Sequence, residues 1–189
     1  MQNKPKTALI ALGANLTSPG ESIEESIARA ILELPTDEES IFSRSDMFRT
    51  PCFPPGAGPD FVNAAVSLHT RRSPQQLLKH LHAIEEGFGR VRAKRWGERT
   101  LDLDLIAIED VVLPDEKTFQ SWLNLPQEKQ SQMAPGELIL PHPRMQDRGF
   151  VLAPLVQVAP NWCHPVIGKT VNQLYNDLPD AEKENIKPL

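Results

Sequence analysis

The residues best suited to chemistry lie in one stretch, residues 89–104, which reads GRVRAKRWGERTLDLD. Its cations surround one tryptophan, Trp96, and it ends in two carboxylates, Asp102 and Asp104. The cations are Arg90, Arg92, Lys94, Arg95 and Arg99. Arginine offers a planar, bidentate fork to phosphate oxygens, and magnesium is usually held by one or two carboxylates together with substrate phosphates. The stretch therefore predicts a site for a polyphosphate and a divalent metal, with a solvated basic loop as the structural alternative.

The two carboxylates fall on a predicted strand. Leucines alternate with aspartates at 101–105, within a strand predicted at 101–108, so the strand would place leucines on one face and both aspartates on the other. Residues two apart on a strand are separated by roughly 6–7 Å at Cα, close enough to share a cation or to bridge two. Aspartate is uncommon in strands, so this pair beside a basic cluster favours a metal site over an ordinary exposed face.

Familiar catalytic motifs are missing from the sequence. It has no GxxxxGK[ST] stretch, so a nucleotide site here would not be of the P-loop type, and it has no HExxH. The five histidines are scattered without metal-ligand spacing. His142 is of most interest, because Pro141 and Pro143 restrict the backbone on either side of it.

Length and composition limit the class of protein. The 189 residues, 40% hydrophobic and 24% charged, predict one globular domain spanning 1–189. A net charge of -5 argues against a general nucleic-acid coat protein. Two cysteines make no disulfide framework, and no stretch has the length and apolarity of a membrane span or a signal peptide. We therefore expect a cytoplasmic location.

Hydrophobic periodicity predicts an α+β fold of the ferredoxin-like type, with helices packed on an antiparallel sheet and additions at the C-terminal end. The expected order is β-α-β-β-α-β, with strands at 7–12, 39–48, 61–70 and 101–108 and helices at 22–34 and 74–87. A polar segment at about 112–136 is expected to be a surface insertion. Beyond it we expect a strand at 138–140, a helix at 150–158 that Pro154 interrupts early, a hairpin at 162–171, a helix at 171–178 and a charged, frayed tail after Pro179.

Several motifs, in order, resemble those of one enzyme family. They are LGANL at 12–16, RTP at 49–51, DFVNAA at 60–65, GRVR with RWGERTLDLDLI, and LPHPRM with RGF at 140–150. Together they resemble the 6-hydroxymethyl-7,8-dihydropterin pyrophosphokinases of folate biosynthesis. The resemblance implies transfer of pyrophosphate from ATP to the hydroxymethyl oxygen of the pterin, leaving AMP, with two magnesium ions.

The resemblance also implies roles for individual residues. Asp102 and Asp104 would hold the metals, and one of them would help to deprotonate the attacking hydroxyl. The ATP contacts would be Leu78, Arg90, Arg92, Trp96, Arg99, Leu105, His142 and Arg148, with Arg90 and Arg92 acting in catalysis from a mobile loop. The pterin contacts would be Thr50, Pro51, Phe53, Phe61, Asn63, Trp96 and Phe150, with the two rings of Phe61 and Phe150 on either side of the pterin and the Asn63 amide reading its edge.

The sequence departs from the family pattern in three places. Glu98 stands in WGER where the family commonly has proline, and it adds an acid beside the phosphate site. The basic loop is one residue shorter than in some members, so Lys94 and Arg95 receive no assignment. The 112–136 segment is longer than in compact members and carries no implied role.

Two other classes of function compete with this one. A ferredoxin-like RNA-binding module would use the basic loop and Trp96, but the net acidity and the neighbouring carboxylates repel phosphates unless a metal intervenes. A metal-dependent nuclease also pairs carboxylates around magnesium. We expect a monomer that binds ATP and the pterin and has neither nucleic acid nor a membrane as a partner.

Overall fold

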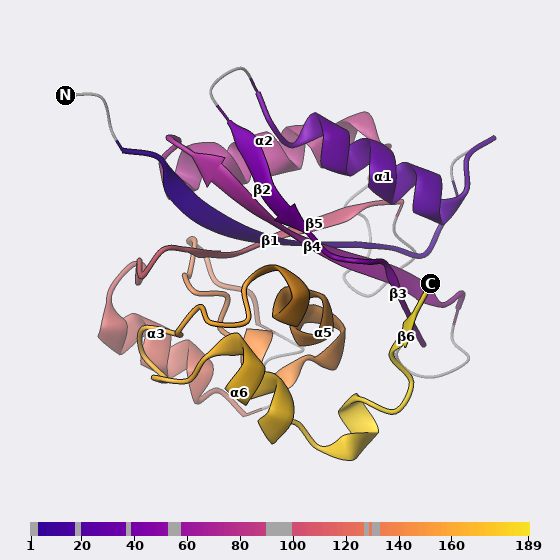
Figure 1. Cartoon of the computed structure of the whole chain (residues 1–189). Coiled ribbons are helices and arrows are strands. Elements are labelled where there is room, and N and C mark those ends of the chain that lie inside the picture. The colour runs from indigo at the N-terminus through magenta and orange to yellow at the C-terminus, as the bar shows by residue number, and fades with distance from the viewer. Residues whose placement is uncertain are drawn as a thin grey trace.

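An antiparallel β-sheet separates two layers of helices in the computed structural model (Figure 1). The structure describes residues 4–17, 20–36, 39–52, 58–89, 100–126, 129 and 133–189. Its strands are β1 (Lys6–Ala14), β2 (Ser40–Arg44), β3 (Phe48–Thr50), β4 (Phe61–Thr70), β5 (Asp102–Ile108) and β6 (Lys187–Pro188). Its helices are α1 (Ile23–Glu33), α2 (Pro74–Gly87), α3 (Glu116–Leu123), α5 (Gly149–Val158) and α6 (Val171–Asp177), with 3₁₀ turns η1 (Met145–Asp147) and η2 (Asp180–Glu182).

The strand order is β5-β1-β4-β3-β6, and β2 pairs with the other end of β4. The predicted α+β class and the β-α-β-β-α-β order are confirmed. The prediction of a single strand at 39–48 was wrong, because β2 ends at Arg44 and a separate strand, β3, begins at Phe48. Between them the Ser45 N–H still donates to the Ala65 carbonyl (2.9 Å), but the Ala65 N–H donates to the Ser45 hydroxyl (2.9 Å). The next residue turns away from β4, and the Asp46 N–H donates to the Gln157 side chain (2.7 Å).

Both faces of the sheet are covered by helices (Figure 1). On one face, α1 and α2 pack on alternate apolar residues of β1, β4 and β5, among them Ile10, Leu12 and Leu103. On the other, α5 and α6 pack on residues such as Leu9 and Ile106. We call these the α1/α2 face and the α5/α6 face.

A β-bulge in β5 changes which residues face which layer. Leu9 pairs with Ala107 and Ile10 pairs with Leu105, so Ile106 is an extra residue on β5. Before the bulge, the predicted division holds: Leu103 and Leu105 lie in the α1/α2 core, and the aspartates point to the other face. Past it, Ile106 and Ala107 both join the α5/α6 core.

Side-chain caps begin the first two helices: α2 starts at the predicted residue 74, and α1 starts at Ile23, one residue after its predicted start. Ser22 and Glu25 form a reciprocal capping box at α1, and Ser73 and Gln76 form another at α2, with Pro74 at the first helical position. These bonds satisfy N–H groups that have no partner inside the helix. They fix where α2 starts, and therefore which of its residues reach β5.

Three expectations for the C-terminal half were wrong. Residues 138–140 form no strand, because only the single bridge between Leu113 and Leu140 links them to another segment. Pro154 does not interrupt its helix: α5 continues through it, held by the buried side chains of Val151, Leu152 and Leu155. The tail does not fray, because β6 pairs with β3.

The 112–136 segment contains α3, which is anchored on the C-terminal part of the chain through Phe119. The Phe119 side chain is fully buried, and its ring centroid lies 5.4 Å from that of His164. The Trp162 ring packs edge-on to the same imidazole at 5.7 Å. His164 is itself buried, and its Nδ1 accepts the backbone N–H groups of Val166 and Ile167, both at 3.2 Å. The proton of the neutral ring is therefore on Nε2.

We predict that the burial of His164 makes stability depend on pH. Desolvation lowers the pKa of His164 to about 4, below its ordinary value of 6.5. The unfolded chain therefore binds more protons between these values, so the free energy of unfolding falls as the pH falls from 6.5 towards 4, by at most about 1.4 kcal/mol per pH unit. Above pH 6.5 the contribution is fully present. Urea unfolding at pH 7, 6 and 5 measures it.

The matched variant is His164→Asn, which retains an oxygen acceptor for the two backbone N–H groups and does not titrate. It should be less stable than the wild type at pH 7 and should lose less stability on acidification. Equal pH slopes for the two proteins would contradict the prediction.

Candidate functional site

The predicted metal-binding and amide residues lie on the same face of the sheet, the α5/α6 face. Asn63 of β4 and Asp102 of β5 are both cross-strand partners of Gly13 in β1. We call Asn63, Gly13 and Asp102 the site row. Strands are about 4.8 Å apart, so the amide and the carboxylate start roughly 10 Å from each other on either side of a residue without a side chain.

Gly13 leaves room for the Asn63 amide because it has no side chain. A Cβ on Gly13 would lie 3.0 Å from Asn63 Oδ1, tighter than ordinary van der Waals contact. Glycine is the usual residue where another group must come this close to the backbone. The middle of the site row is therefore open because the sequence has glycine there.

A second contact fixes the orientation of the Asn63 amide. Its Nδ2 donates to Thr50 Oγ1 at 2.8 Å, and both side chains are buried. Since the nitrogen points to Thr50, the oxygen points towards Gly13, and one amide N–H and the carbonyl oxygen stay available for a ligand. Thr50 pairs with Phe61 across β3 and β4, so Phe61 lies on the same face.

Cys52 closes the base of the segment that follows β3. Its buried thiol donates to the Gly58 carbonyl (3.0 Å) and accepts the Gly58 N–H (3.2 Å). These bonds bring Cys52 and Gly58 together. Pro51, which follows Thr50 in the chain, is exposed. Phe53, predicted to contact the pterin, lies outside the described residues.

Asp102 and Asp104 lie next to each other on the α5/α6 face, and both side chains are partly exposed. In the described part of the chain, no three His, Cys, Asp or Glu residues gather into a cluster able to hold a metal. A pair of carboxylates is nevertheless the donor set that magnesium takes when phosphate oxygens of a ligand complete its coordination. The two aspartates therefore fit a metal that arrives with a polyphosphate.

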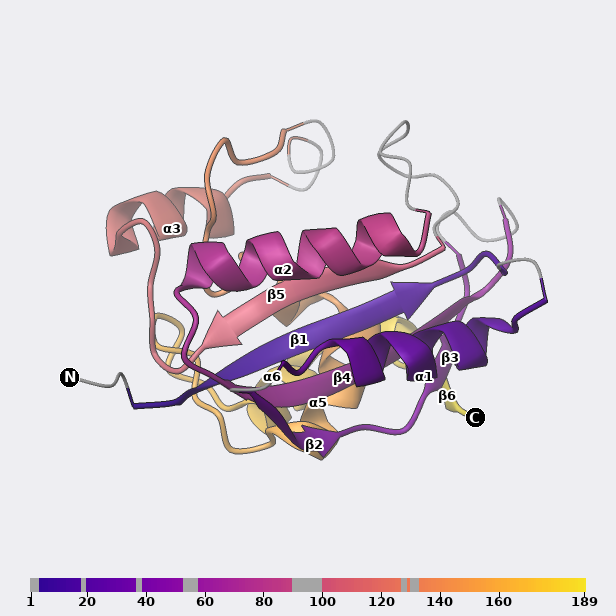
Figure 2. The same cartoon turned by 90° about the horizontal axis from the view of Figure 1, so that it is seen from above.

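Glu85 is a buried acid next to this pair that the sequence analysis missed. It is 1% exposed on α2, which lies along β5 (Figure 2), and its Oε1 accepts the Leu103 backbone N–H at 2.8 Å. Leu103 separates the two aspartates, and its N–H points away from β1 at the sheet edge. The sequence contains one sign of this burial: Glu85 directly follows Ile84 and lies within the apolar stripe of the predicted helix.

His142 lies beside the same strand and is held as a neutral ring. Its backbone N–H donates to the Ile106 carbonyl at 2.7 Å, and its Nδ1 accepts the Arg144 N–H at 3.2 Å. Desolvation, reinforced by the charges of Arg148 and Arg144, lowers the pKa of His142 to about 3, while Asp102 acts in the opposite direction. The ring proton is therefore on Nε2, which can donate to an anion.

The start of α5 carries Arg148 and Phe150, two of the predicted ligand contacts. Arg148 is the N-cap, and its Cζ lies 5.6 Å from the Phe150 ring centroid. Phe150 is 40% exposed at the first turn of a helix whose other residues, apart from Val156 and Gln157, are buried. An exposed ring beside a guanidinium suits a flat ligand next to an anionic one.

The remaining predicted contacts are either on the other face or not described. Leu105 is buried in the α1/α2 core, and Leu78 packs against that core from α2. They lie on the side of the sheet away from the aspartates, so their predicted place at the adenine stays a prediction. Arg90, Arg92, Trp96 and Arg99 lie outside the described residues.

Comparisons with known proteins agree with the motifs. The family model described as 7,8-dihydro-6-hydroxymethylpterin-pyrophosphokinase matches residues 9–160. The chain is 37% identical to a Synechocystis 2-amino-4-hydroxy-6-hydroxymethyldihydropteridine pyrophosphokinase over 167 residues, which cover 88% of this chain and 73% of that protein. It is 31% identical to a Haemophilus influenzae protein of the same name over 182 residues, covering 96% and 99% of the two chains.

Among solved structures, the chain is similar to a Plasmodium falciparum HPPK-DHPS, with a TM-score of 0.66 and 18% identity. The similarity covers 99% of this chain and 47% of that one, so the chain spans about half the length of that protein. At this identity it supports the fold alone. No helix among the described residues has the length and apolarity needed to span a bilayer.

We predict that Glu85 stabilises β5 through the Leu103 N–H. Glu85→Leu should leave that buried donor unpaired and lower the free energy of unfolding by about 1–3 kcal/mol. Glu85→Gln keeps an oxygen acceptor of the same length and should lose less. Urea unfolding of both variants at pH 7 measures the difference. If the two variants were equally destabilised, the hydrogen bond would not be what Glu85 contributes.

Proposed function

Because the chain belongs to the 7,8-dihydro-6-hydroxymethylpterin-pyrophosphokinase family, we propose that the site row and its neighbours on the α5/α6 face form its active site. The enzyme transfers pyrophosphate from ATP to 6-hydroxymethyl-7,8-dihydropterin and releases AMP and the pterin diphosphate, a step in folate biosynthesis. The observation that carries the proposal is the site row itself. It places an amide suited to the pterin and a carboxylate suited to a metal-bound phosphate on either side of Gly13.

The pterin half of the site is built from β3, β4 and the start of α5. The Asn63 amide, oriented by Thr50, offers an N–H and a carbonyl oxygen to the donor and acceptor groups of the pterin edge. Phe61 and the exposed ring of Phe150 supply aromatic faces on either side of it. Pro51 continues this wall, and Phe53 and Trp96 complete it in our assignment.

The phosphate half is built from β5 and the residues beside it. Asp102 and Asp104 would hold magnesium, two ions in our proposal, which would neutralise and orient the phosphates of ATP. His142 donates from Nε2 to a phosphate oxygen as a neutral group, and Arg148 supplies a charged fork. We assign Arg90, Arg92 and Arg99 to the same phosphates, and Leu78 and Leu105 to the adenine.

Such a transfer requires little covalent chemistry from the protein. The hydroxymethyl oxygen attacks the β-phosphorus of ATP, the bond from that phosphorus to the oxygen bridging it to the α-phosphate breaks, and AMP leaves. The hydroxyl proton passes to one of the two carboxylates. Positioning and charge neutralisation provide most of the acceleration in phosphoryl-type transfer. In our proposal Arg90 and Arg92 act mainly after both substrates are bound.

Location and assembly complete the proposal. We expect the enzyme to work in the cytoplasm as a monomer and to bind neither nucleic acid nor a membrane. The 112–136 segment, with α3 held by Phe119, would be an insertion within a single domain spanning 1–189.

The direct test is incubation with ATP, Mg²⁺ and 6-hydroxymethyl-7,8-dihydropterin, followed by nucleotide analysis. We expect AMP and the pterin diphosphate in equal amounts. Asp102→Asn and Asp104→Asn keep the side-chain shape and remove a charge that stabilises the transition state, so each should lower kcat about 1000-fold. The control is Asp110→Asn, an exposed carboxylate just past the same strand, which should retain full activity. ADP as the nucleotide product, or full activity in either site variant, would overturn the assignment.

The spacing at Gly13 yields a second prediction. Gly13→Ala should push the Asn63 amide away from its position, raise the KM for the pterin about tenfold and leave the KM for ATP unchanged, because about 1.4 kcal/mol of binding corresponds to a factor of ten. Gly136→Ala is the control, since a Cβ there meets no atom within 4 Å. Steady-state kinetics with each substrate varied measures the effect. An unchanged pterin KM would show that Asn63 does not read the pterin.

A further inference from the structure

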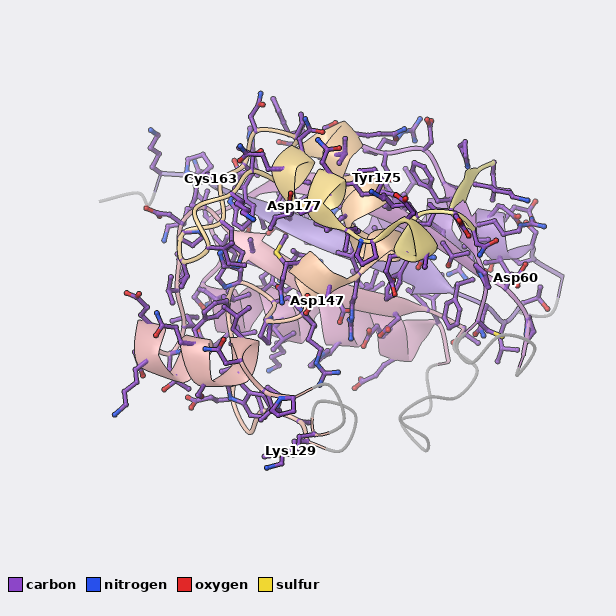
Figure 3. All side chains as sticks on the ribbon, turned by 90° about the horizontal axis from the view of Figure 1, so that it is seen from below. Asp60, Lys129, Asp147, Cys163, Tyr175 and Asp177 are labelled. Carbon is purple, nitrogen blue, oxygen red and sulfur yellow. The ribbon has the colours of Figure 1, made fainter. Side chains whose placement is uncertain are left out.

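Residues 180–189, which we call the C-terminal strap, cross from the end of α6 to the edge of the sheet (Figure 1). The strap begins as η2 and ends as β6, which pairs with β3. Asp60, just before β4, lies at the same end of the α5/α6 face as β6 (Figure 3). The strap therefore ends beside the elements that carry the pterin half of the site. It also lies beyond residue 160, where the family match stops.

The first contact of the strap is with the start of α5. A Cβ on Gly149 would lie 2.1 Å from the Glu182 carbonyl oxygen and 2.8 Å from Ile186 Cδ1. The closer of these atoms belongs to the backbone, so it cannot turn aside as the end of a long side chain can. Only glycine lets the strap pack this closely, and Gly149 stands between Arg148 and Phe150.

The second contact is with β3. Pro188 pairs with Phe48, Lys187 pairs with Arg49, and the Leu189 N–H donates to the Met47 carbonyl at 2.9 Å. β3 has only three residues, and its other edge pairs with β4. The strap thus supports the outer edge of a very short strand that ends in Thr50.

The strap adds little to the hydrophobic core. Most of its side chains are exposed, Leu189 at 55%, while Lys183 and Ile186 are partly buried. The segment before it is anchored by buried residues of α6, Val171 and Leu174, and by Leu178. A segment held by backbone pairing and one glycine contact is better suited to placing its neighbours than to stabilising the fold as a whole.

We propose that the C-terminal strap is a positioning element that sets the distance between two parts of the pterin half, which we call its two walls: Thr50 on β3, which orients the Asn63 amide, and Phe150 on α5. It touches β3 at one end and Gly149 at the other, so it joins two elements far apart in sequence. This inference rests on the proposed function for its kinetic consequence. The structural part of the proposal is that one segment holds both walls, and this can be tested without substrate.

Two full-length variants test the strap at its two ends. Gly149→Ala places a methyl group against the Glu182 carbonyl. Lys187→Gly/Pro188→Gly increases the backbone freedom of β6 and changes no residue of the site. Lys4→Gly/Pro5→Gly is the matched control, because the same dipeptide stands exposed just before β1. The start of β1 pairs with the end of β4, whereas β3, which carries the strap, pairs with the start of β4. Gly136→Ala is the control for the first variant.

We expect the Lys187→Gly/Pro188→Gly variant to raise the KM for the pterin about fivefold, with the KM for ATP, kcat and Tm close to wild type. Gly149→Ala should raise the pterin KM further, because it moves the start of α5 directly. An unchanged pterin KM in the double variant overturns the proposal. So does a uniform loss of activity that follows Tm, which would indicate a purely structural role.

Hydrogen exchange separates a failure of the strap from a failure of the proposed function. In the double variant, backbone amides in 47–50 and 149–152 should both exchange faster than in the wild type, and those of β1 should not. If the wild type makes no AMP, the proposed function fails, and the exchange result alone decides whether the strap holds both walls. Faster exchange in 47–50 without any change in 149–152 would overturn the strap.

Discussion

The register of β1 against its two neighbours is the constraint on which the site depends. β1 pairs with β4 on one side and with β5 on the other, and Gly13 is opposite Asn63 and Asp102 at once. A slip of one residue in either pairing would turn one of these side chains to the opposite face. The distance between the two halves of the site is therefore set by backbone hydrogen bonds over two long strands, and not by contacts between the functional side chains.

Hydrogen bonds from other segments hold the outer edge of β5, the strand that carries Asp102 and Asp104. Among the strands that the structure describes, β5 pairs with β1 alone. On the other side, Glu85 accepts the Leu103 N–H and the His142 backbone N–H donates to the Ile106 carbonyl. Such bonds satisfy an edge that would otherwise be open to water or to another strand. They also bring the neutral imidazole of His142, with its proton on Nε2, close to Asp102.

Much of the fold could be predicted from the sequence, because apolar residues that recur at strand or helix spacing indicate which side chains are buried. β4 has the range that its pattern predicts, and the leucine–aspartate alternation placed both acids on one face. The pattern failed where side chains replace backbone partners, as at Ser45, which separates β2 from β3. It also failed to single out Glu85, because local periodicity does not reveal which backbone N–H a buried acid will meet. The roles proposed for residues such as Asn63 came from family motifs, since an amide within an apolar strand has no periodic signature.

The strap marks the limit of pattern-based prediction for a physical reason. A charged, exposed segment has no hydrophobic periodicity, so its sequence predicts a disordered tail. Backbone pairing with β3 nevertheless holds it in place, and the missing side chain of Gly149 lets it pack closely on α5. Neither interaction requires a particular apolar residue within the strap. Because the strap buries little, changes in it can alter the placement of Thr50 and Phe150 without a matching loss of global stability. Segments of this kind are found by asking where backbone donors and acceptors go, and which glycines have a neighbour in place of a side chain.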